Sequence, residues 1–186
     1  MTEKLGESGE KVGSEIDNAL AIGKLLGTEE DLIRAVKFGA TKHLGQLDDE
    51  GYIYFISHCM PVAFLLRYLG CDIDVITAGL LHDTLEDTKT ITAELEISFN
   101  KRVARLVQMV THDGQKDEVG FYFPRLHIDS ELKPTLEELR DATLIKFADR
   151  MSNISRMDGW DDKRKLQYLK RSTFWRINNN DSKSKT

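Results

Sequence analysis

The fold of this chain is decided by the stretch Leu80-Leu81-His82-Asp83-Thr84-Leu85-Glu86-Asp87-Thr88. It completes an uncharged segment, residues 75–81, that leaves no polar face, which is typical of a helix buried on all sides. An imidazole and a carboxylate at the end of such a helix are costly to bury unless another charge compensates them. Because a divalent cation is the natural compensating charge, His82 and Asp83 predict a metal site.

Length and composition fit one globular domain. The 186 residues are 40% hydrophobic and 31% charged, which is ordinary for a protein with a core of its own. No apolar run approaches the ~20 residues that span a bilayer, and the N-terminus has no signal-peptide core. We therefore expect a cytoplasmic protein that does not act at a membrane. The net charge of −5 argues against nonspecific nucleic-acid binding, which needs a basic surface.

Apolar residues recur mostly at helical spacing, and strand signals are scarce. We expect an all-α helical bundle, with a flexible N-terminus over residues 1–12, a single domain over 13–177 and a disordered tail over 178–186. Residues 52–56 are expected to form a short strand or an ordered loop, and residues 112–134 a long loop. The predicted helices span residues 14–25, 29–45, 58–69, 73–87, 90–97, 100–111, 135–157 and 161–175.

Capping signals mark the helix starts. Asp74 is predicted to cap the helix that carries His82. Thr135 and Glu138 form a capping-box pattern at the start of the helix over 135–157. Four residues at helical spacing predict the core stripe of that long helix, namely Leu144, Phe147, Met151 and Ile154. Trp160 and Trp175 are expected to anchor the final helix.

Two imidazoles and two carboxylates from three predicted helices form the candidate metal site. The candidate ligands are His58, His82, Asp83 and Asp149. This donor set suits Mn²⁺, Mg²⁺ or Fe²⁺, whereas a structural zinc site would favour thiolates. Four protein ligands leave positions open for water and a substrate oxygen, as a hydrolase requires. Cys59 and Cys71 are interpreted as small buried thiols.

Two further carboxylates follow the doublet at helical spacing. Glu86 comes four residues after His82, and Asp87 four residues after Asp83, so both would share the ligands' side of a continuous helix. A carboxylate in that position can orient a metal-bound water, take its proton and later protonate a leaving group. We therefore expect Glu86 and Asp87 to be the catalytic pair.

Candidate substrate contacts flank the metal ligands. Lys146 and Asn153 lie one helical turn on either side of Asp149, where an ammonium and an amide suit a phosphate or a ribose. Lys42 and His43, at the end of the helix over 29–45, are further candidates. For Lys42 the alternative is a solvated surface lysine, and for His43 it is a core position.

Four motifs in this order resemble the HD-domain metal-dependent phosphohydrolases. More narrowly, they are similar to the alarmone hydrolase domain of the Rel/SpoT enzymes and to its small single-domain relatives. The similarity covers roughly residues 30–175. The motifs are His43-Leu44-Gly45-Gln46, Phe55-Ile56-Ser57-His58, the stretch from Leu80 to Thr88, and Lys146-Phe147-Ala148-Asp149-Arg150-Met151-Ser152-Asn153.

The resemblance implies an all-helical HD-domain fold and one Mn²⁺ held by the four candidate ligands. The implied reaction is hydrolysis of the 3′-pyrophosphate of (p)ppGpp, which gives GDP or GTP and pyrophosphate. Glu86 and Asp87 would handle the attacking water and its proton, and Asn153 would contact the nucleotide. A small stand-alone hydrolase is expected, because 186 residues leave no room for a synthetase domain. The oligomeric state is left open.

The chain departs from the family pattern at three places. Relatives carry a basic loop where this chain has Asp48-Asp49-Glu50, and like charges near a polyphosphate reduce affinity. Phe55 replaces the usual tyrosine, so a hydroxyl is missing there. The proline that usually follows the ligand histidine is displaced to Pro61. These departures motivate one alternative, an HD phosphohydrolase acting on another nucleotide. The other alternative is a non-catalytic nucleotide-binding module, against which the intact Glu86-Asp87 pair argues.

Overall fold

The computed structural model describes residues 4–112 and 130–172, with side chains from residue 13 onward. Within these ranges the chain is helical and contains no β-strand, so the predicted all-α fold is confirmed. The elements are α1 Lys4–Leu26, α2 Glu30–Lys42, the π-helical turn η1 Phe55–Cys59, α3 Met60–Tyr68, α4 Ile73–Leu81, α5 Thr84–Asp87, α6 Thr92–Ser98, α7 Lys101–Val110, α8 Leu136–Ile154 and α9 Asp162–Arg171.

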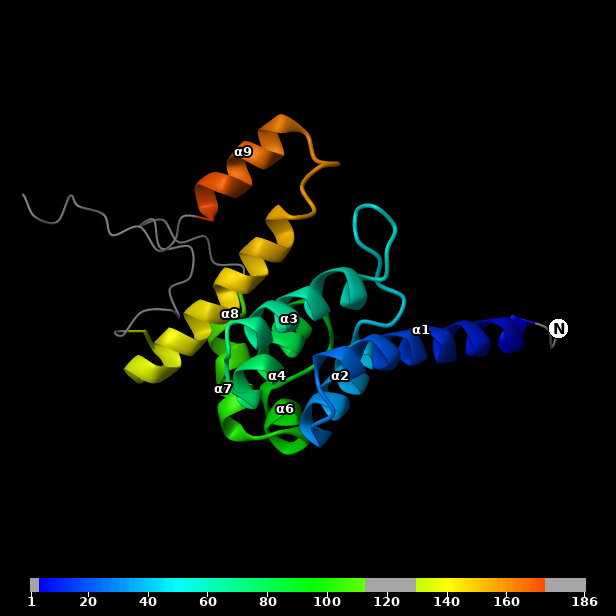
Figure 1. Cartoon of the computed structure of the whole chain (residues 1–186), viewed down its shortest axis with the longest axis horizontal. Helices are drawn as coiled ribbons and strands as arrows, with labels where there is room; N and C mark the ends of the chain where they lie inside the picture. Colours follow the sequence, from blue (N-terminus) through cyan, green and yellow to red (C-terminus); the bar gives the residue numbers. More distant parts are fainter. Residues whose placement is uncertain (1–3, 113–129, 173–186) are drawn as a thin grey trace, which may run out of the picture.

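Helix α4 lies at the centre of the bundle, in contact with α2, α3, α7 and α8 (Figure 1). Every residue from Val75 to Leu81 is buried, as the uncharged sequence predicted. Gly79 permits the close approach of α3, because a Cβ at this position would lie 2.3 Å from Leu66 Cδ1. His82 and Asp83 therefore emerge from the most crowded part of the molecule.

The predicted helix over 73–87 is broken at the doublet. Helix α4 ends at Leu81, and the separate turn α5 follows from Thr84 to Asp87. The hydroxyl of Thr84 donates to the Leu81 carbonyl at 2.6 Å, a local side-chain bond that competes with the regular helix ladder. The backbone N–H of Asp87 still donates to the Asp83 carbonyl at 2.8 Å, so one helical turn separates these residues as predicted.

The two predicted helix caps have different outcomes. The cap of α4 is Asp72, which is extended and accepts from Val75 N at 3.0 Å. The prediction of Asp74 was wrong because that residue already lies inside the first helical turn. The capping box at the start of α8 is confirmed, since the Thr135 hydroxyl and the Glu138 carboxylate each accept from the other's backbone N–H.

The predicted core stripe of α8 is confirmed only in part: Leu144 is half-buried and packs against the core, whereas the next two residues of the stripe are exposed. Phe147 is 36% exposed and Met151 is 41% exposed. The buried face carries small or polar side chains instead, among them Ala142, Ala148, Asp149 and Ser152. This face lies against η1, α3 and α4, and it holds the candidate ligand beside the fully buried Ile145.

The run over residues 52–56 forms no strand beyond an isolated bridge between Leu47 and Ile53. Helical structure begins at Tyr54 and passes through η1 into α3, so the helix predicted from residue 58 starts earlier. The ring of Phe55 packs against Gly39, where a Cβ would lie 2.3 Å from the ring. A π-helical turn is a frequent feature of functional sites, and here it carries His58.

Other boundaries differ by a few residues. Helix α1 begins at Lys4 rather than near residue 14, in a segment whose glycines have low helix propensity. Its first half projects away from the bundle (Figure 1). Helix α2 ends at Lys42, before Gly45 adopts a φ of 75°. Trp175, most of the predicted loop over 112–134 and the predicted tail lie outside the described residues. Among the helices described, none has the length and apolar character needed to cross a membrane.

Candidate metal centre and adjoining pocket

The four predicted metal ligands converge on one point. The Nε2 atoms of His58 and His82 lie 3.2 Å apart. Asp83 Oδ2 lies 2.9 Å from His82 Nε2 and 3.3 Å from His58 Nε2. Asp149 Oδ1 lies 3.4 Å from His58 Nε2 and 3.8 Å from His82 Nε2. All four side chains are buried, and they come from η1, from the residues that follow α4, and from α8.

Hydrogen bonds fix the orientation of both imidazoles. His82 Nδ1 lies 2.9 Å from the Gly79 carbonyl, which can only accept, so Nδ1 carries the proton and Nε2 presents a lone pair. The Ser152 hydroxyl donates to the His58 carbonyl at 3.3 Å and therefore accepts from His58 Nδ1 at 3.0 Å. In the neutral form of each ring the proton is on Nδ1, and the two Nε2 lone pairs then point at the same space.

The charges at this point call for a cation. Burial opposes the ionised form of Asp83, but His82 and His58 hold its pKa well below the usual range. Burial also opposes ionisation of Asp149, where Lys146 and His58 lower the pKa. For His58, burial disfavours the charged form, yet the carboxylates of Asp149 and Asp83 raise its pKa to about 9. Two ionised carboxylates thus draw a positive charge into the space between the imidazoles.

These donors suit a divalent ion bound by nitrogen and oxygen atoms better than a metal ion bound by thiolates. Two imidazole nitrogens and two carboxylate oxygens are the set expected for Mn²⁺, Mg²⁺ or Fe²⁺. The Sγ of Cys59 also lies within 4.8 Å of donor atoms of His82 and Asp83. Burial raises the pKa of the Cys59 thiol well above its usual value, which keeps it protonated and agrees with the interpretation as a buried thiol.

A cavity of about 170 Å³ opens beside the four ligands and is lined by both predicted catalytic carboxylates. Glu86 Oε2 accepts from the backbone N–H of His112 at 3.0 Å. Asp87 also lines the cavity, and partial desolvation and the charges of Asp83 and Glu86 raise its pKa to about 6. A carboxyl with this pKa can exchange a proton near neutral pH, as acid–base catalysis requires.

Two of the four predicted substrate contacts lie in the same cavity. Lys146 Nζ lies 2.8 Å from Asp149 Oδ2, and Asn153 Nδ2 donates to Asp149 Oδ1 at 2.7 Å. Both residues line the cavity and hold the Asp149 carboxylate in place. Their polar groups stand where a phosphate or ribose oxygen could reach them.

The other two predicted substrate contacts are not brought to the cavity wall. Lys42 Nζ pairs with Glu94 of α6 at 2.6 Å, because the last turn of α2 faces that helix. His43 is buried, and its Nδ1 lies 2.7 Å from Gln46 Oε1. Neither residue lines this cavity or the pocket beside it, so a direct contact with substrate is not supported for either.

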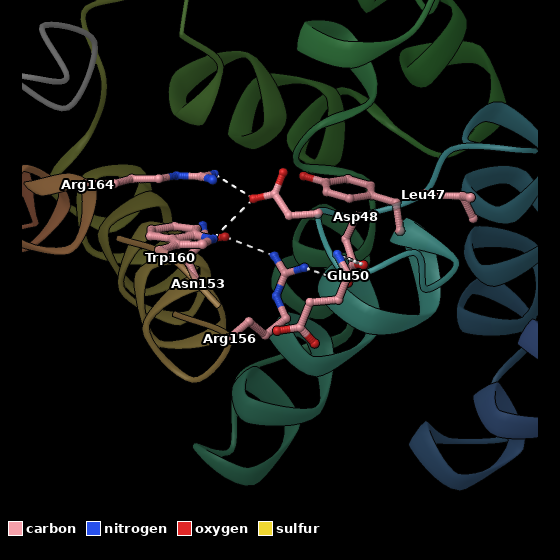
Figure 2. Close-up of a pocket in the computed structure, with 9 residues that line it drawn as sticks. Leu47, Asp48, Glu50, Asn153, Arg156, Trp160 and Arg164 are labelled. Atoms are coloured by element: carbon pink, nitrogen blue, oxygen red, sulfur yellow. Dashed lines mark hydrogen bonds and ion pairs between the residues drawn. The ribbon is translucent and has the colours of Figure 1, made fainter. Parts of the chain in front are cut away.

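Figure 2 shows a second pocket, of about 220 Å³. It adjoins the cavity, because Tyr54 and Asn153 line both. One wall is the acidic segment Asp48–Glu50, and the opposite wall follows α8 and α9. Asp48 is only 8% exposed and pairs with Arg156 at 3.2 Å. Arg164, whose guanidinium lies 3.9 Å over the Trp160 ring, pairs with Asp49 at 2.6 Å. Two of the three acidic charges are therefore compensated, which the sequence did not reveal.

Three residues of the site escaped the sequence prediction. Ser152 orients His58, and Arg150 lines the cavity. Both lie inside the motif over residues 146–153, so their position in that motif could have indicated a role in the site. Tyr54 donates its hydroxyl to Asp83 Oδ2 at 2.6 Å. A tyrosine hydroxyl is thus present, one residue before Phe55, where the sequence suggested its loss.

A helical bundle with this constellation defines an HD-domain protein. A family model described as HD domain matches residues 35–175. The chain therefore belongs to the HD-domain family, as the four motifs predicted.

The chain is also similar to curated enzymes. It is 37% identical over 147 residues to the guanosine-3′,5′-bis(diphosphate) 3′-pyrophosphohydrolase MESH1 of Danio rerio, which covers 74% of this chain and 78% of that protein. It is 35% identical over 154 residues to the Homo sapiens protein of the same name, with 77% and 82% covered. Identity to the Aquifex aeolicus guanosine-3′,5′-bis(diphosphate) 3′-pyrophosphohydrolase is 39% over 128 residues, covering 67% of this chain but only 17% of that longer protein.

A solved structure agrees with these matches. It is described as "A metazoan ortholog of SpoT hydrolyzes ppGpp and plays a role in starvation responses". It superposes with a TM-score of 0.63 at 28% identity, covering 79% of this chain and 84% of that chain.

Proposed function

We propose that this protein is a metal-dependent (p)ppGpp 3′-pyrophosphohydrolase that uses Mn²⁺. The observation that carries the proposal is the convergence of four donors, His58, His82, Asp83 and Asp149. Three of them line one cavity together with Glu86 and Asp87. The named activity of the MESH1 relatives, which align with about three quarters of the chain, supports this choice of substrate.

Water would attack the phosphorus atom that is bonded to the 3′ oxygen. The bond between this phosphorus and the 3′ oxygen would then break, which releases pyrophosphate. A divalent ion at the four donors would lower the pKa of a bound water and polarise a phosphoryl oxygen. The Glu86-Asp87 pair would take the proton from water and return it to the leaving 3′ oxygen. The pKa of about 6 at Asp87 suits a group that changes protonation in each cycle.

The cationic side of the cavity suits the phosphates. Lys146 and Arg150 both line it, and a guanidinium or an ammonium stabilises phosphate oxygens by charge-assisted hydrogen bonds. Asn153 lines both the cavity and the adjoining pocket, and from there its amide could form a hydrogen bond with the ribose. In this arrangement the 3′-pyrophosphate occupies the cavity, and the uncharged guanine base extends into the adjoining pocket.

The acidic segment is compatible with this placement. Asp48 and Asp49 are paired with Arg156 and Arg164, so two of the three acidic charges that line the adjoining pocket are compensated. A neutral base can enter without the repulsion that an uncompensated acidic loop would exert on a polyphosphate.

The proposal is tested with protein stripped by EDTA and reloaded with Mn²⁺. It is incubated with ppGpp and with a panel of other nucleotides, and pyrophosphate and orthophosphate are measured separately. We expect pyrophosphate from ppGpp only. Orthophosphate from another nucleotide would support a different HD phosphohydrolase, and no release from any substrate would support a binding module. Asp149→Asn should be inactive, and the matched control Asp158→Asn, at an exposed position, should keep the parental rate.

A further inference from the structure

The segment between α2 and η1, residues 43–54, touches the site at two points that the proposed reaction does not assign. We propose that Gln46 and Tyr54 are positioning residues, Tyr54 for the Asp83 carboxylate and Gln46 for the turn that carries Glu86 and Asp87. The inference deepens the proposed function and rests on it for the role of that turn.

The side chain of Gln46 bridges two elements in a single orientation. Its Nε2 donates to the Asp87 carbonyl at 3.0 Å, so its Oε1 is left as the acceptor for His43 Nδ1 at 2.7 Å. An amide turned the other way would face the Asp87 carbonyl with an oxygen, which cannot donate. The Asp87 carbonyl thus fixes the direction of the amide, and the buried His43 ring, which packs near the rings of Tyr54 and Phe55, donates to its oxygen.

Tyr54 meets the metal ligands from the same segment. Its hydroxyl donates to Asp83 Oδ2 at 2.6 Å, and this oxygen is the one that lies 2.9 Å from His82 Nε2. A hydrogen bond to a ligating carboxylate fixes its orientation, and its loss typically weakens metal binding. The backbone N–H of Tyr54 donates to the Gln46 carbonyl at 2.9 Å, so the two supports form one unit.

The turn α5 depends on outside contacts. It has only four residues, Thr84 to Asp87, and an isolated helix of that length has no stability of its own. Its last carbonyls lack helical partners, and its acidic residues oppose the helix dipole at that end. The Thr88 hydroxyl caps the Thr84 carbonyl at 2.6 Å, whereas Gln46 supplies the donor for Asp87. Removal of the Gln46 amide should therefore allow α5, the turn that carries Glu86 and Asp87, to shift.

Three variants separate the two roles: Tyr54→Phe, Gln46→Met and, as a matched control, Tyr52→Phe, whose side chain is 62% exposed. Mn²⁺ affinity is measured by calorimetry on EDTA-stripped protein. Tyr54→Phe should weaken it by about tenfold or more, whereas Gln46→Met and the control should stay within about twofold of the parent. Parental Mn²⁺ affinity in a folded Tyr54→Phe variant would overturn the role of Tyr54.

Hydrogen exchange followed by mass spectrometry reports on the turn without any substrate. Residues 84–88 should lose protection by about tenfold in Gln46→Met, while the centre of α4 and the control variant remain unchanged. Equal protection of residues 84–88 in Gln46→Met and the parent would overturn the role of Gln46. Both readouts decide the inference even if the parent releases no pyrophosphate, an outcome that would contradict only the proposed function.

Kinetics adds a readout that a merely structural role would not move. With saturating Mn²⁺, Gln46→Met should lower kcat for ppGpp by about 10- to 100-fold at an unchanged KM, because a small displacement of a catalytic group has effects of this size. In an Asp87→Asn background the same substitution should change kcat by less than about twofold, since the positioned group is already gone. Full additivity of the two losses would contradict the proposed route through Asp87.

Discussion

Glu86 and Asp87 are neighbours in the sequence, yet the structure gives them different surroundings. Glu86 accepts a hydrogen bond from the backbone of His112, which fixes one of its oxygens. Asp87 receives its support at the backbone, from Gln46, and its carboxyl has a pKa raised to about 6. The oriented carboxylate of Glu86 suits a group that accepts a proton from water, and the carboxyl of Asp87 suits a group that donates one to the leaving oxygen.

Glu86→Gln should keep metal binding and lose turnover. The amide oxygen can still accept from the His112 N–H, so the substitution removes the charge and basicity while it preserves the contact. General-base catalysis is worth about 10²- to 10⁴-fold, and we expect kcat for pyrophosphate release to fall within that range. Calorimetry with Mn²⁺ serves as the control. A Glu86→Gln enzyme with parental kcat would show that Glu86 does not activate water.

Asp87→Asn should change how the stability of the metal-free protein depends on pH. The pKa of Asp87 is raised from 3.8 to about 6 in the folded state. Between these values the native state binds a proton that the unfolded state has released, so this group makes the protein less stable as pH rises from 4 to 6. After allowance for solvent around this exposed carboxylate, the effect is about 1 kcal/mol.

Thermal unfolding in EDTA measures this difference. The variant should match the parent near pH 4 and unfold at a higher temperature above pH 6, by about 2–4 °C. A difference in Tm that stays constant from pH 4 to pH 8 would mean that Asp87 does not titrate in this window.

The four converging candidate ligands could be predicted from the sequence, but the groups that orient them could not. His82 and Asp83 stand in an uncharged helix, and His58 and Asp149 follow in family order, so these residue types in this order were sufficient. The partner of His58 is Ser152, 94 residues away. A lone serine carries no signal of such a pairing, because its hydroxyl can bond locally in most contexts.

The same distinction applies to whole elements. The burial of α4 was predictable because residues 75–81 carry no charge and leave no polar face. The rotation of α8 was not, because its apolar residues were compatible with two neighbouring faces and the site placed Asp149 inward. The break after α4 depends on the Thr84 hydroxyl, a local contact that competes with the helix and leaves no trace in apolar periodicity.

Gly79→Ala should destabilise the bundle. The added Cβ would lie 2.3 Å from Leu66 Cδ1, and overpacking of a core typically costs about 1–3 kcal/mol. The matched control is Gly13→Ala in α1, where a Cβ meets nothing within 4 Å; alanine there should stabilise by about 0.5–1 kcal/mol. Urea denaturation measures both. If Gly79→Ala is as stable as Gly13→Ala, the close contact between α3 and α4 does not limit this position.

Across the whole molecule, α8 is held to α4 at two separate places. At its start Arg102 of α7 bonds the buried Asp141 at 2.6 Å and also Asp72, the cap of α4, at 2.9 Å. At its other end the contact consists of Asp149 facing the two histidines and Asp83. At the first contact the carboxylates are compensated by the guanidinium of Arg102. At the second contact, carboxylates and imidazole lone pairs lie together and favour a bound cation.

Mn²⁺ should therefore stabilise the fold as well as serve the reaction. A ligand that binds only the native state adds about 2.7 kcal/mol at 100 times its Kd, which for a domain of this size corresponds to about 5–10 °C in Tm. Scanning calorimetry of EDTA-stripped protein, with and without Mn²⁺, measures the shift. Asp149→Asn should abolish it, because one of the donors that join α8 to α4 is lost. Asp158→Asn should retain it, and an equal shift in both variants would place the stabilising ion away from the four ligands.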